Sequence, residues 1–268
     1  MSLIRASSHI HNDKPEPTHT MSKPPVSVLT VTRNGFFFSR LLVEKVRQFT
    51  TDRNYQIIVV DRGSTDATRS WMRAQPDVDF ISFRQWRTRG HGHAEAAARG
   101  LEVARHEHIV LLDSDAHPVA DDWLTLSLDK LDRQVRLAGA VFVDKHAGNP
   151  HGWYVHPHFM CFLRADFGRL IELRKLRGHA TDTGEEATIR VLEQGFSIVK
   201  HPIQFAADFA VGHPRVPTLA GNVFHAWYVS RLESDESGVA RETEGQVTRA
   251  SYLLPLQDKL RAMYGLDY

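Results

Sequence analysis

The first half of the chain alternates short apolar strands with helices, and this alternation restricts the fold more than any other feature. β-branched and apolar runs predict the strands, and stripes of apolar or alanine side chains predict the helices. Repeats of this kind form parallel sheets with right-handed crossovers. We therefore predict an α/β fold with a mostly parallel, Rossmann-like central sheet flanked by helices. The strands are expected at residues 26–31, 55–60, 78–83 and 108–112, and the helices at 37–49, 67–74 and 93–105.

The composition narrows the functional classes. The chain has 268 residues, 42% of them hydrophobic and 24% charged, which is typical of a soluble globular protein. Its net charge of +1 gives no reason to expect a nucleic acid partner. No apolar stretch approaches the ~20 residues that span a bilayer. The single cysteine, Cys161, cannot form an internal disulfide. These features predict a cytoplasmic protein without a transmembrane segment.

Two aspartates separated by one residue, Asp113 and Asp115, follow the fourth predicted strand. Side chains two residues apart on an extended chain point the same way. Ligands of open α/β sheets bind beyond the carboxyl ends of the strands. The two carboxylates are thus suited to one divalent cation that also bridges substrate phosphates, or to a cation and a sugar hydroxyl. Many short acidic triplets are solvent-exposed turns or helix caps, but the buried strand before this one favours the metal site.

Other common motifs are missing or incomplete. Neither G-x-G-x-x-G nor a Walker A sequence occurs, which argues against a dinucleotide dehydrogenase and a P-loop NTPase. The pairs His91 and His93, and His106 and His108, have no cysteine partners and no H-E-x-x-H spacing. We interpret these histidines as surface or phosphate-side residues rather than as zinc ligands.

The second half of the chain is less regular. Strands are predicted at residues 137–143, 159–164 and 197–201, and helices at 167–177 and 185–194. An amphipathic terminal helix is predicted at 251–264.

Residues 26–118 contain four motifs whose order and spacing agree with a known family. They are Val26-Ser27-Val28-Leu29 with Asn34, the run from Ile57 to Asp66, Ala97-Ala98-Arg99-Gly100-Leu101, and Leu111-Leu112-Asp113-Ser114-Asp115. With these motifs, the segment resembles the nucleotide-sugar-binding half of the family 2 glycosyltransferases. The resemblance implies the GT-A fold and a metal-dependent enzyme that moves a sugar from a nucleoside diphosphate sugar to an acceptor hydroxyl.

The resemblance also implies roles for single residues. Asp115 would hold Mn²⁺ or Mg²⁺, and Asp113 would face the metal or the ribose. His225 lies in a segment that resembles one where a histidine completes the metal shell, with a buried histidine as the alternative. The residues expected to bind the donor are Val31, Arg33, Asp61, Arg62, Arg89, Asp113, Ser114, Trp227 and Arg231.

One position departs from the family pattern. The family usually has an aspartate that contacts the base where this chain has Arg62. Arginine offers only hydrogen-bond donors, whereas the imino N–H of uracil or guanine needs an acceptor. The identity of the base is therefore open, and an Arg62 that points away from the pocket is the alternative interpretation.

The resemblance places an acidic motif at the start of a later helix, where inverting members carry their general base. Asp182 is the first candidate and Glu185 the second. An acidic residue here also serves as an ordinary helix cap, so both interpretations stand. Inversion itself rests on the resemblance alone, and a retaining enzyme shares this half-fold. A nucleotidyltransferase, or a non-catalytic relative that binds sugar nucleotides, also remains open at this point.

The pattern and the resemblance together predict four segments. Residues 1–24 are a disordered leader, and 25–118 are the nucleotide-sugar-binding half. Residues 119–247 are the acceptor-binding and catalytic half of the same domain, and 248–268 carry the terminal helix. That helix can pack on the domain, form a homodimer or dock on a membrane surface. The acceptor can be a small molecule, a glycan or a lipid-linked sugar. Aromatic side chains of residues 152–158 are candidates for the acceptor site.

Overall fold

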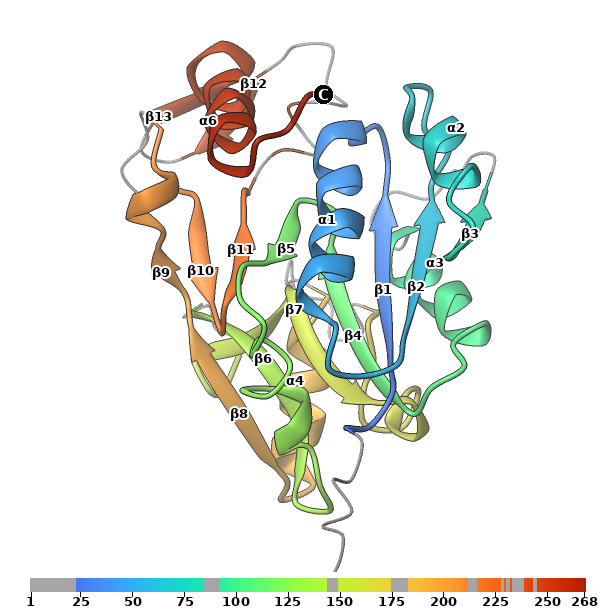
Figure 1. Ribbon diagram of the computed structural model, residues 1–268. Coiled ribbons are helices and arrows are strands. Elements are labelled where there is room, and N and C mark those ends of the chain that lie inside the picture. The colour runs from blue at the N-terminus through green and yellow to red at the C-terminus, as the bar shows by residue number, and fades with distance from the viewer. Residues whose placement is uncertain are drawn as a thin grey trace, which may run out of the picture.

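The centre of the protein is a seven-stranded sheet with the order β3-β2-β1-β4-β7-β6-β8 (Figure 1). In this computed structural model β1 pairs in parallel with β2 and β4, β2 with β3, and β6 with β8. β7 runs antiparallel to its neighbours β4 and β6. The predicted α/β fold with a mostly parallel sheet is confirmed. The strands are β1 (Val26–Thr32), β2 (Tyr55–Asp61), β3 (Val78–Ser82), β4 (His108–Asp113), β6 (Val135–Val143), β7 (Trp153–Leu163) and β8 (Ser197–Pro202).

The structure describes most of the chain from residue 23 onward. Residues 1–22 of the predicted leader lie outside the described part, which comprises 23–83, 92–143, 149–174, 183–211, 216–227, 229, 232, 239–242 and 245–268.

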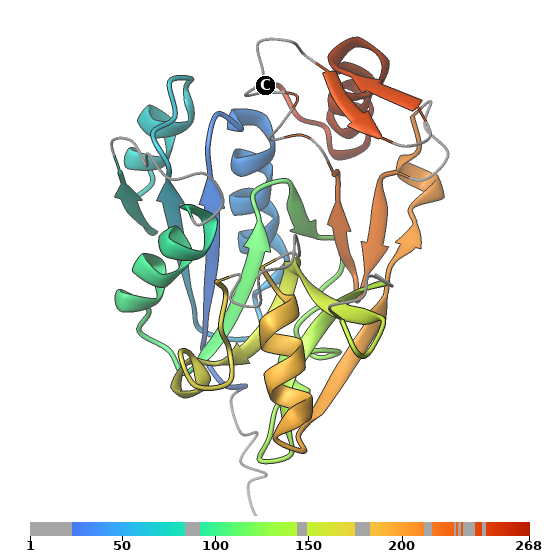
Figure 2. The same ribbon diagram turned by 180° about the vertical axis from the view of Figure 1, so that it is seen from behind.

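Helices cover both faces of the sheet (Figures 1 and 2). Neighbouring residues of a strand point to opposite faces, so Val28 joins the cluster beneath α1 whereas Leu29 joins the cluster beneath α3. α3 can approach β1 closely because Gly100 has no side chain. A Cβ at this position would lie 2.2 Å from Leu29 Cδ1. Burial on both faces explains the continuous apolar runs Ile57–Val60 in β2 and Ile109–Leu112 in β4. The helices are α1 (Phe36–Phe49), α2 (Thr68–Arg73), α3 (Gly92–Glu102) and α4 (Glu185–Glu193).

The helix predicted at residues 167–177 is wrong for its described part. A short 3-10 turn, Arg164–Asp166, is followed by a second turn at 168–170, and Phe167 forms an isolated bridge with Ile171. Gly168 has a φ of 79°, a left-handed conformation that interrupts an α-helix. Leu170 is fully buried although this segment is not helical, so its apolar character reflects burial rather than a helix.

A smaller sheet lies beside the central one, with the order β5-β11-β10-β9. α6 follows a π-helical turn, Arg249–Leu253, so the terminal helix begins three residues later than predicted. Short 3-10 turns occur at Leu128–Lys130 and Ala207–Phe209. The remaining elements are β5 (Ala116–Pro118), β9 (Gln204–Phe205), β10 (Thr218–Ala220), β11 (Val223–His225), β12 (Val239–Glu242), β13 (Gly245–Thr248) and α6 (Leu254–Tyr264).

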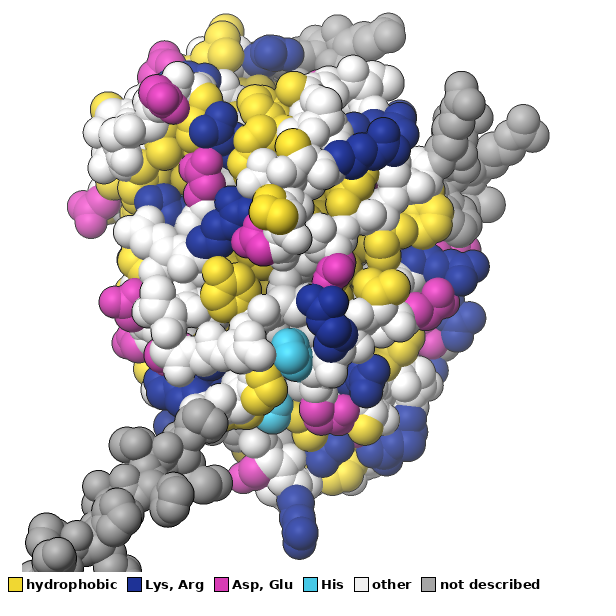
Figure 3. Space-filling view, turned by 45° about the vertical axis from the view of Figure 1, so that its right-hand side comes forward, with side chains coloured by type: hydrophobic (Ala, Val, Ile, Leu, Met, Phe, Trp, Pro, Cys, Tyr) yellow, Lys and Arg dark blue, Asp and Glu magenta, His cyan; other side chains and the backbone are white. Residues whose placement is uncertain are grey.

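The surface carries mixed charge. On the face in Figure 3, Lys and Arg side chains lie among Asp and Glu side chains, as expected for a net charge of +1. Among the residues that the structure describes, no helix is both long enough and apolar enough to cross a membrane.

The buried His117 should make the free energy of unfolding fall as the pH is lowered. Burial, together with nearby Lys45, lowers the pKa of His117 from 6.5 to about 3, and its Nε2 lies 3.1 Å from the Tyr264 hydroxyl. Below pH 6.5 the unfolded chain binds a proton that the folded chain does not, so stability falls as the pH falls. Between pH 6.5 and 5 we expect a loss of about 2 kcal/mol from this residue. Chemical denaturation of wild type and His117→Gln in EDTA, at both pH values, measures it. Equal pH dependence of the two proteins would contradict this assignment.

Candidate active site

Asp113 and Asp115 lie at the carboxyl end of β4, where the central sheet meets the smaller sheet. β4 ends at Asp113, and β5 begins at Ala116 immediately after Asp115. β11 pairs antiparallel with β5, with His225 opposite Ala116. The Ala226 N–H donates to the Asp115 carbonyl over 3.0 Å. This pairing brings His225 to the two aspartates from a distant part of the sequence.

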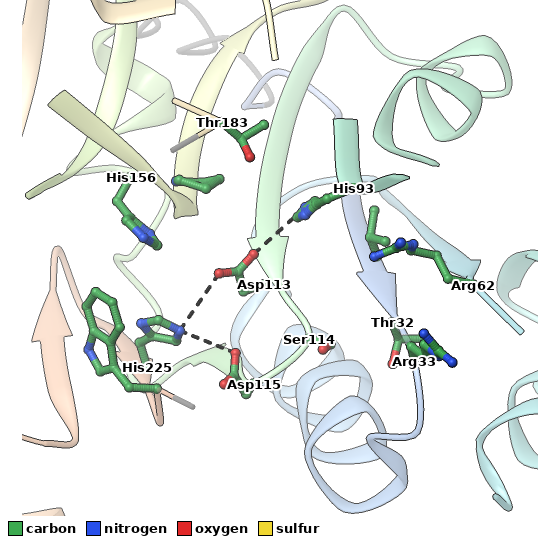
Figure 4. A pocket seen from close by; sticks show the side chains of 13 residues that line it. Thr32, Arg33, Arg62, His93, Asp113, Ser114, Asp115, His156, Thr183 and His225 are labelled. Carbon is green, nitrogen blue, oxygen red and sulfur yellow. Dashed lines mark ion pairs between the residues drawn. The ribbon is translucent and has the colours of Figure 1, made fainter. Parts of the chain in front are cut away.

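The three side chains converge (Figure 4). His225 Nε2 lies 3.3 Å from Asp115 Oδ1 and 3.8 Å from Asp113 Oδ2. One ligand atom of each residue lies within 4.8 Å of the others. The His225 and Asp115 side chains are 4% and 8% exposed, whereas Asp113 is 24% exposed at the pocket surface. Two carboxylates and an imidazole suit Mn²⁺, and Mg²⁺ less well because it prefers oxygen ligands.

His93 completes the surroundings of Asp113. It lies in the first turn of α3, and its Nε2 is 3.9 Å from Asp113 Oδ1 (Figure 4). Burial raises the pKa of Asp113, while His225, His156 and His93 oppose this shift. The sequence alone predicts a surface or phosphate-side histidine at His93 and does not place it beside Asp113. Its place beside Asp113 depends on the packing of α3 against β1 and β2.

Two arginines form the opposite wall of the site. Arg33 follows β1, and Arg62 follows β2. The Arg62 guanidinium crosses the start of α3, where a Cβ at Gly92 would lie 2.2 Å from Arg62 Nη2. Burial lowers the pKa of Arg62, Arg33 adds to this shift, and Glu95 opposes it. Arg62 Nε is buried and has no hydrogen-bond partner among the described residues. Two neighbouring guanidinium groups of this kind favour an anionic ligand.

Histidine and aromatic side chains form a third wall. His156 comes from β7, and Trp227 follows β11. The Trp227 ring lies 4.4 Å from the His225 ring and 5.1 Å from the His156 ring. Trp227 Nε1 donates to Thr218 Oγ1 over 2.7 Å, which holds the indole against this wall. His158 stacks on His225 from behind at 4.3 Å, and burial lowers its pKa well below 6.5, so this ring is neutral.

These walls enclose a cavity of about 390 Å³, a size that accommodates a small-molecule ligand. Of the thirteen lining residues, eight had been predicted at a donor or metal site: Val31, Arg33, Arg62, Asp113, Ser114, Asp115, His225 and Trp227. The lining residues that sequence reasoning did not assign to the donor site or the metal are Thr32, His93, His156, Pro157 and Thr183.

The other predicted site residues have different positions. Asp61 is fully buried and does not line the cavity. Its carboxylate accepts from the Ser64 N–H and hydroxyl and from the Ser82 hydroxyl, and thus supports the turn that carries Arg62. Glu185 is the first residue of α4, is 4% exposed and does not line the cavity, whereas Thr183 does. Arg89, Asp182 and Arg231 lie outside the described residues.

Comparison with solved structures supports the fold. The mannosyltransferase PcManGT from Pyrobaculum calidifontis, solved with GDP-Man and Mn²⁺, superposes with a TM-score of 0.51 at 21% identity. The alignment covers 67% of this chain and 55% of PcManGT. GalNAc-T7, solved with UDP, GalNAc and Mn²⁺, superposes with a TM-score of 0.50 at 15% identity, over 66% of this chain and 42% of that protein. The chain therefore has the GT-A fold of these transferases.

Comparison of sequences identifies the family. EpsH of Bacillus subtilis (strain 168), which is named as a glycosyltransferase, is 31% identical over 119 residues. That match covers 44% of this chain and 32% of EpsH, so the chain spans about a third of this relative. The model of glycosyl transferase family 2 matches residues 27–192, which is more than half of the chain. The protein, with its acidic, histidine-capped pocket at the carboxyl end of β4, belongs to glycosyl transferase family 2.

Proposed function

We propose that the protein moves a sugar from a nucleoside diphosphate sugar to an acceptor hydroxyl, with a divalent cation and with inversion at the anomeric carbon. One observation carries this proposal. Asp113, Asp115 and His225 converge in a cavity whose opposite wall carries Arg33 and Arg62. A cation on one side and guanidinium groups on the other suit a diphosphate. The family membership supports it, and so do proteins of the same fold that were solved with GDP-Man and Mn²⁺, or with UDP, GalNAc and Mn²⁺.

The side chains of the cavity have two different proposed roles, metal binding and stabilisation of the diphosphate. Asp113, Asp115 and His225 would hold Mn²⁺ or Mg²⁺ through two carboxylate oxygens and an imidazole nitrogen. When bound, the cation neutralises negative charge on the departing diphosphate. Arg33 and Arg62 add hydrogen-bond donors directed at developing charge, which is most effective in a cavity shielded from water. Of the predicted donor-binding residues, Val31, Ser114 and Trp227 line the same cavity.

A carboxylate near the start of α4 is proposed as the general base. The acceptor oxygen attacks the anomeric carbon as the bond from that carbon to the diphosphate oxygen breaks, and the hydroxyl proton passes to the carboxylate. Asp182 is the first candidate and Glu185 the second. Glu185 lies in the first turn of α4, where the helix dipole stabilises a negative charge.

A nucleotide panel tests this function and identifies the base that Arg62 leaves open. Thermal denaturation is followed with UDP, GDP, dTDP, CDP and ADP, each with Mn²⁺ and with EDTA. A ligand that binds the folded state alone raises the melting temperature according to its occupancy. We expect one nucleotide to stabilise the protein strongly with Mn²⁺ and weakly with EDTA. No stabilisation by any of the five would favour a non-catalytic relative.

A further inference from the structure

We infer that His156 donates a hydrogen bond from Nε2–H to the transferred sugar, and that His158 fixes the tautomer that makes this possible. This inference rests on the proposed function, because it concerns the sugar part of the same donor. It assigns a specificity-determining role to a residue that the sequence placed only within a general acceptor-side segment.

The two histidines lie on the same face of β7. They are two residues apart on an extended strand, so both rings point toward the cavity side of the sheet. His156 lines the cavity and is 7% exposed, whereas His158 lies behind it and is fully buried. His156 Nδ1 receives two contacts from His158. The backbone N–H of His158 donates to it over 3.2 Å, and His158 Nδ1 lies 2.9 Å away.

These contacts determine where the proton of His156 lies. A backbone N–H is always a donor, so the nitrogen that faces it must be an acceptor. His156 Nδ1 therefore carries a lone pair, and the ring proton is on Nε2. It follows that His158 Nδ1 is protonated and donates to His156 as well. The assignment depends on the direction of one backbone N–H, and the opposite tautomer would set two donors against each other.

The fixed tautomer restricts what His156 can do chemically. With Nδ1 occupied by two donors and Nε2 protonated, the ring has no free lone pair to accept a proton from an acceptor hydroxyl. It can donate from Nε2–H to a substrate oxygen. His156 is thus excluded as the general base in this state, which leaves that role to the carboxylates near α4.

The position of His156 in the cavity indicates which part of the donor it contacts. Its ring lies on the wall of Trp227 and His225, at 5.1 and 6.1 Å between ring centroids. Arg33 and Arg62 lie across the cavity, beyond Asp113 (Figure 4). If the arginine side takes the nucleotide, the group between the cation and His156 is the sugar. Sugar hydroxyl oxygens accept hydrogen bonds, and the neighbouring Trp227 ring offers an apolar face for the sugar ring.

The test compares two ligands in four proteins. The first ligand is the nucleoside diphosphate that stabilises the protein most in the nucleotide panel, with Mn²⁺. The second is the sugar nucleotide with the same base, chosen from UDP-glucose, GDP-mannose, dTDP-glucose, CDP-glucose and ADP-glucose. Wild type, His156→Ala, His156→Gln and the control His151→Ala are titrated calorimetrically. His151 is an exposed histidine outside the cavity. Glutamine carries an amide N–H near the position of Nε2 and so retains the donor.

We expect His156→Ala to weaken binding of the sugar nucleotide about tenfold and to leave the nucleoside diphosphate unchanged, as loss of one buried hydrogen bond predicts. His156→Gln should stay within about threefold of wild type. Two-bond ¹H–¹⁵N spectra of ¹⁵N-histidine-labelled protein, assigned by the signal lost in His156→Gln, should give the Nε2–H tautomer.

An Nδ1–H or doubly protonated His156 would overturn the inference. The inference would also be overturned if His156→Ala weakened the binding of both ligands equally, or of neither. In either case, nucleotide binding by the wild-type protein would leave the proposed function intact. If wild type bound no nucleotide at all, the proposed function would fail and this inference with it.

Discussion

Asp115→Asn is expected to lower the rate of glycosyl transfer by roughly a hundredfold to a thousandfold, the range found when one preorganised electrostatic partner of the transition state is removed. The Asp115 side chain is 8% exposed, and its Oδ1 lies 3.3 Å from His225 Nε2, at the centre of the candidate metal site. The amide keeps the size of the side chain and one oxygen but removes the charge that attracts a divalent cation. Initial rates across an Mn²⁺ titration, and Mn²⁺ affinity measured by calorimetry, report the two effects separately.

A second readout separates loss of function from loss of fold. Asp115 is one of the groups that raise the pKa of Asp113, because two carboxylates lie close together in a buried site. Removing one of these charges should leave the melting temperature in EDTA unchanged or raised. Asp121→Asn makes the same chemical change at an exposed turn and should retain full activity. Wild-type Mn²⁺ affinity and rate in Asp115→Asn would remove this residue from the metal site.

Gly184→Ala is expected to reduce the free energy of unfolding by about 3 kcal/mol, the upper range for overpacking a buried position. A Cβ at this position would lie 1.8 Å from the Val155 carbonyl oxygen, a backbone atom that cannot turn aside. Gly184 has a φ of −87°, which alanine adopts readily, so the effect is steric. For a chain of this size the melting temperature should fall by roughly 6–12 °C.

The expected damage extends to the cavity. Thr188 Oγ1 accepts from the Val155 N–H over 2.9 Å and donates to the Gly184 carbonyl over 3.0 Å, which joins α4 to β7. Pushing α4 away would displace Thr183 from the cavity wall, so activity should fall at temperatures where the variant is still folded.

Gly195→Ala is the matched control for this substitution. A Cβ there meets nothing within 4 Å, but its φ of +78° is left-handed. That strain should cost about 1 kcal/mol. A loss in Gly184→Ala no larger than in Gly195→Ala would show that the contact with Val155 relaxes freely. Calorimetric melting curves of both variants and wild type make the comparison.

Local patterns predicted the first half of the fold well. The predicted strands at the start of the chain differ from β1, β2, β3 and β4 by one residue at most. Short apolar runs and helical apolar stripes are strong local signals. Strands of two or three residues, such as Gln204–Phe205 and Thr218–Ala220, have no period to detect and were missed. The helix predicted at 167–177 does not form in its described part, where Gly168 has a left-handed conformation. The apolar residues Leu170 and Ile171 are buried there without being helical.

The parallel half of the sheet, the family resemblance and the acidic pair could all be predicted from the sequence, because a buried strand that ends in Asp113 and Asp115 is a local signal. The rest of the site depends on how the chain packs. His225 reaches the aspartates through the pairing of β11 with β5, and His156 reaches the cavity because β7 is inserted antiparallel beside β4. Such contacts join residues far apart in the chain, and their partners are selected by sheet order and register, which no short window of sequence contains.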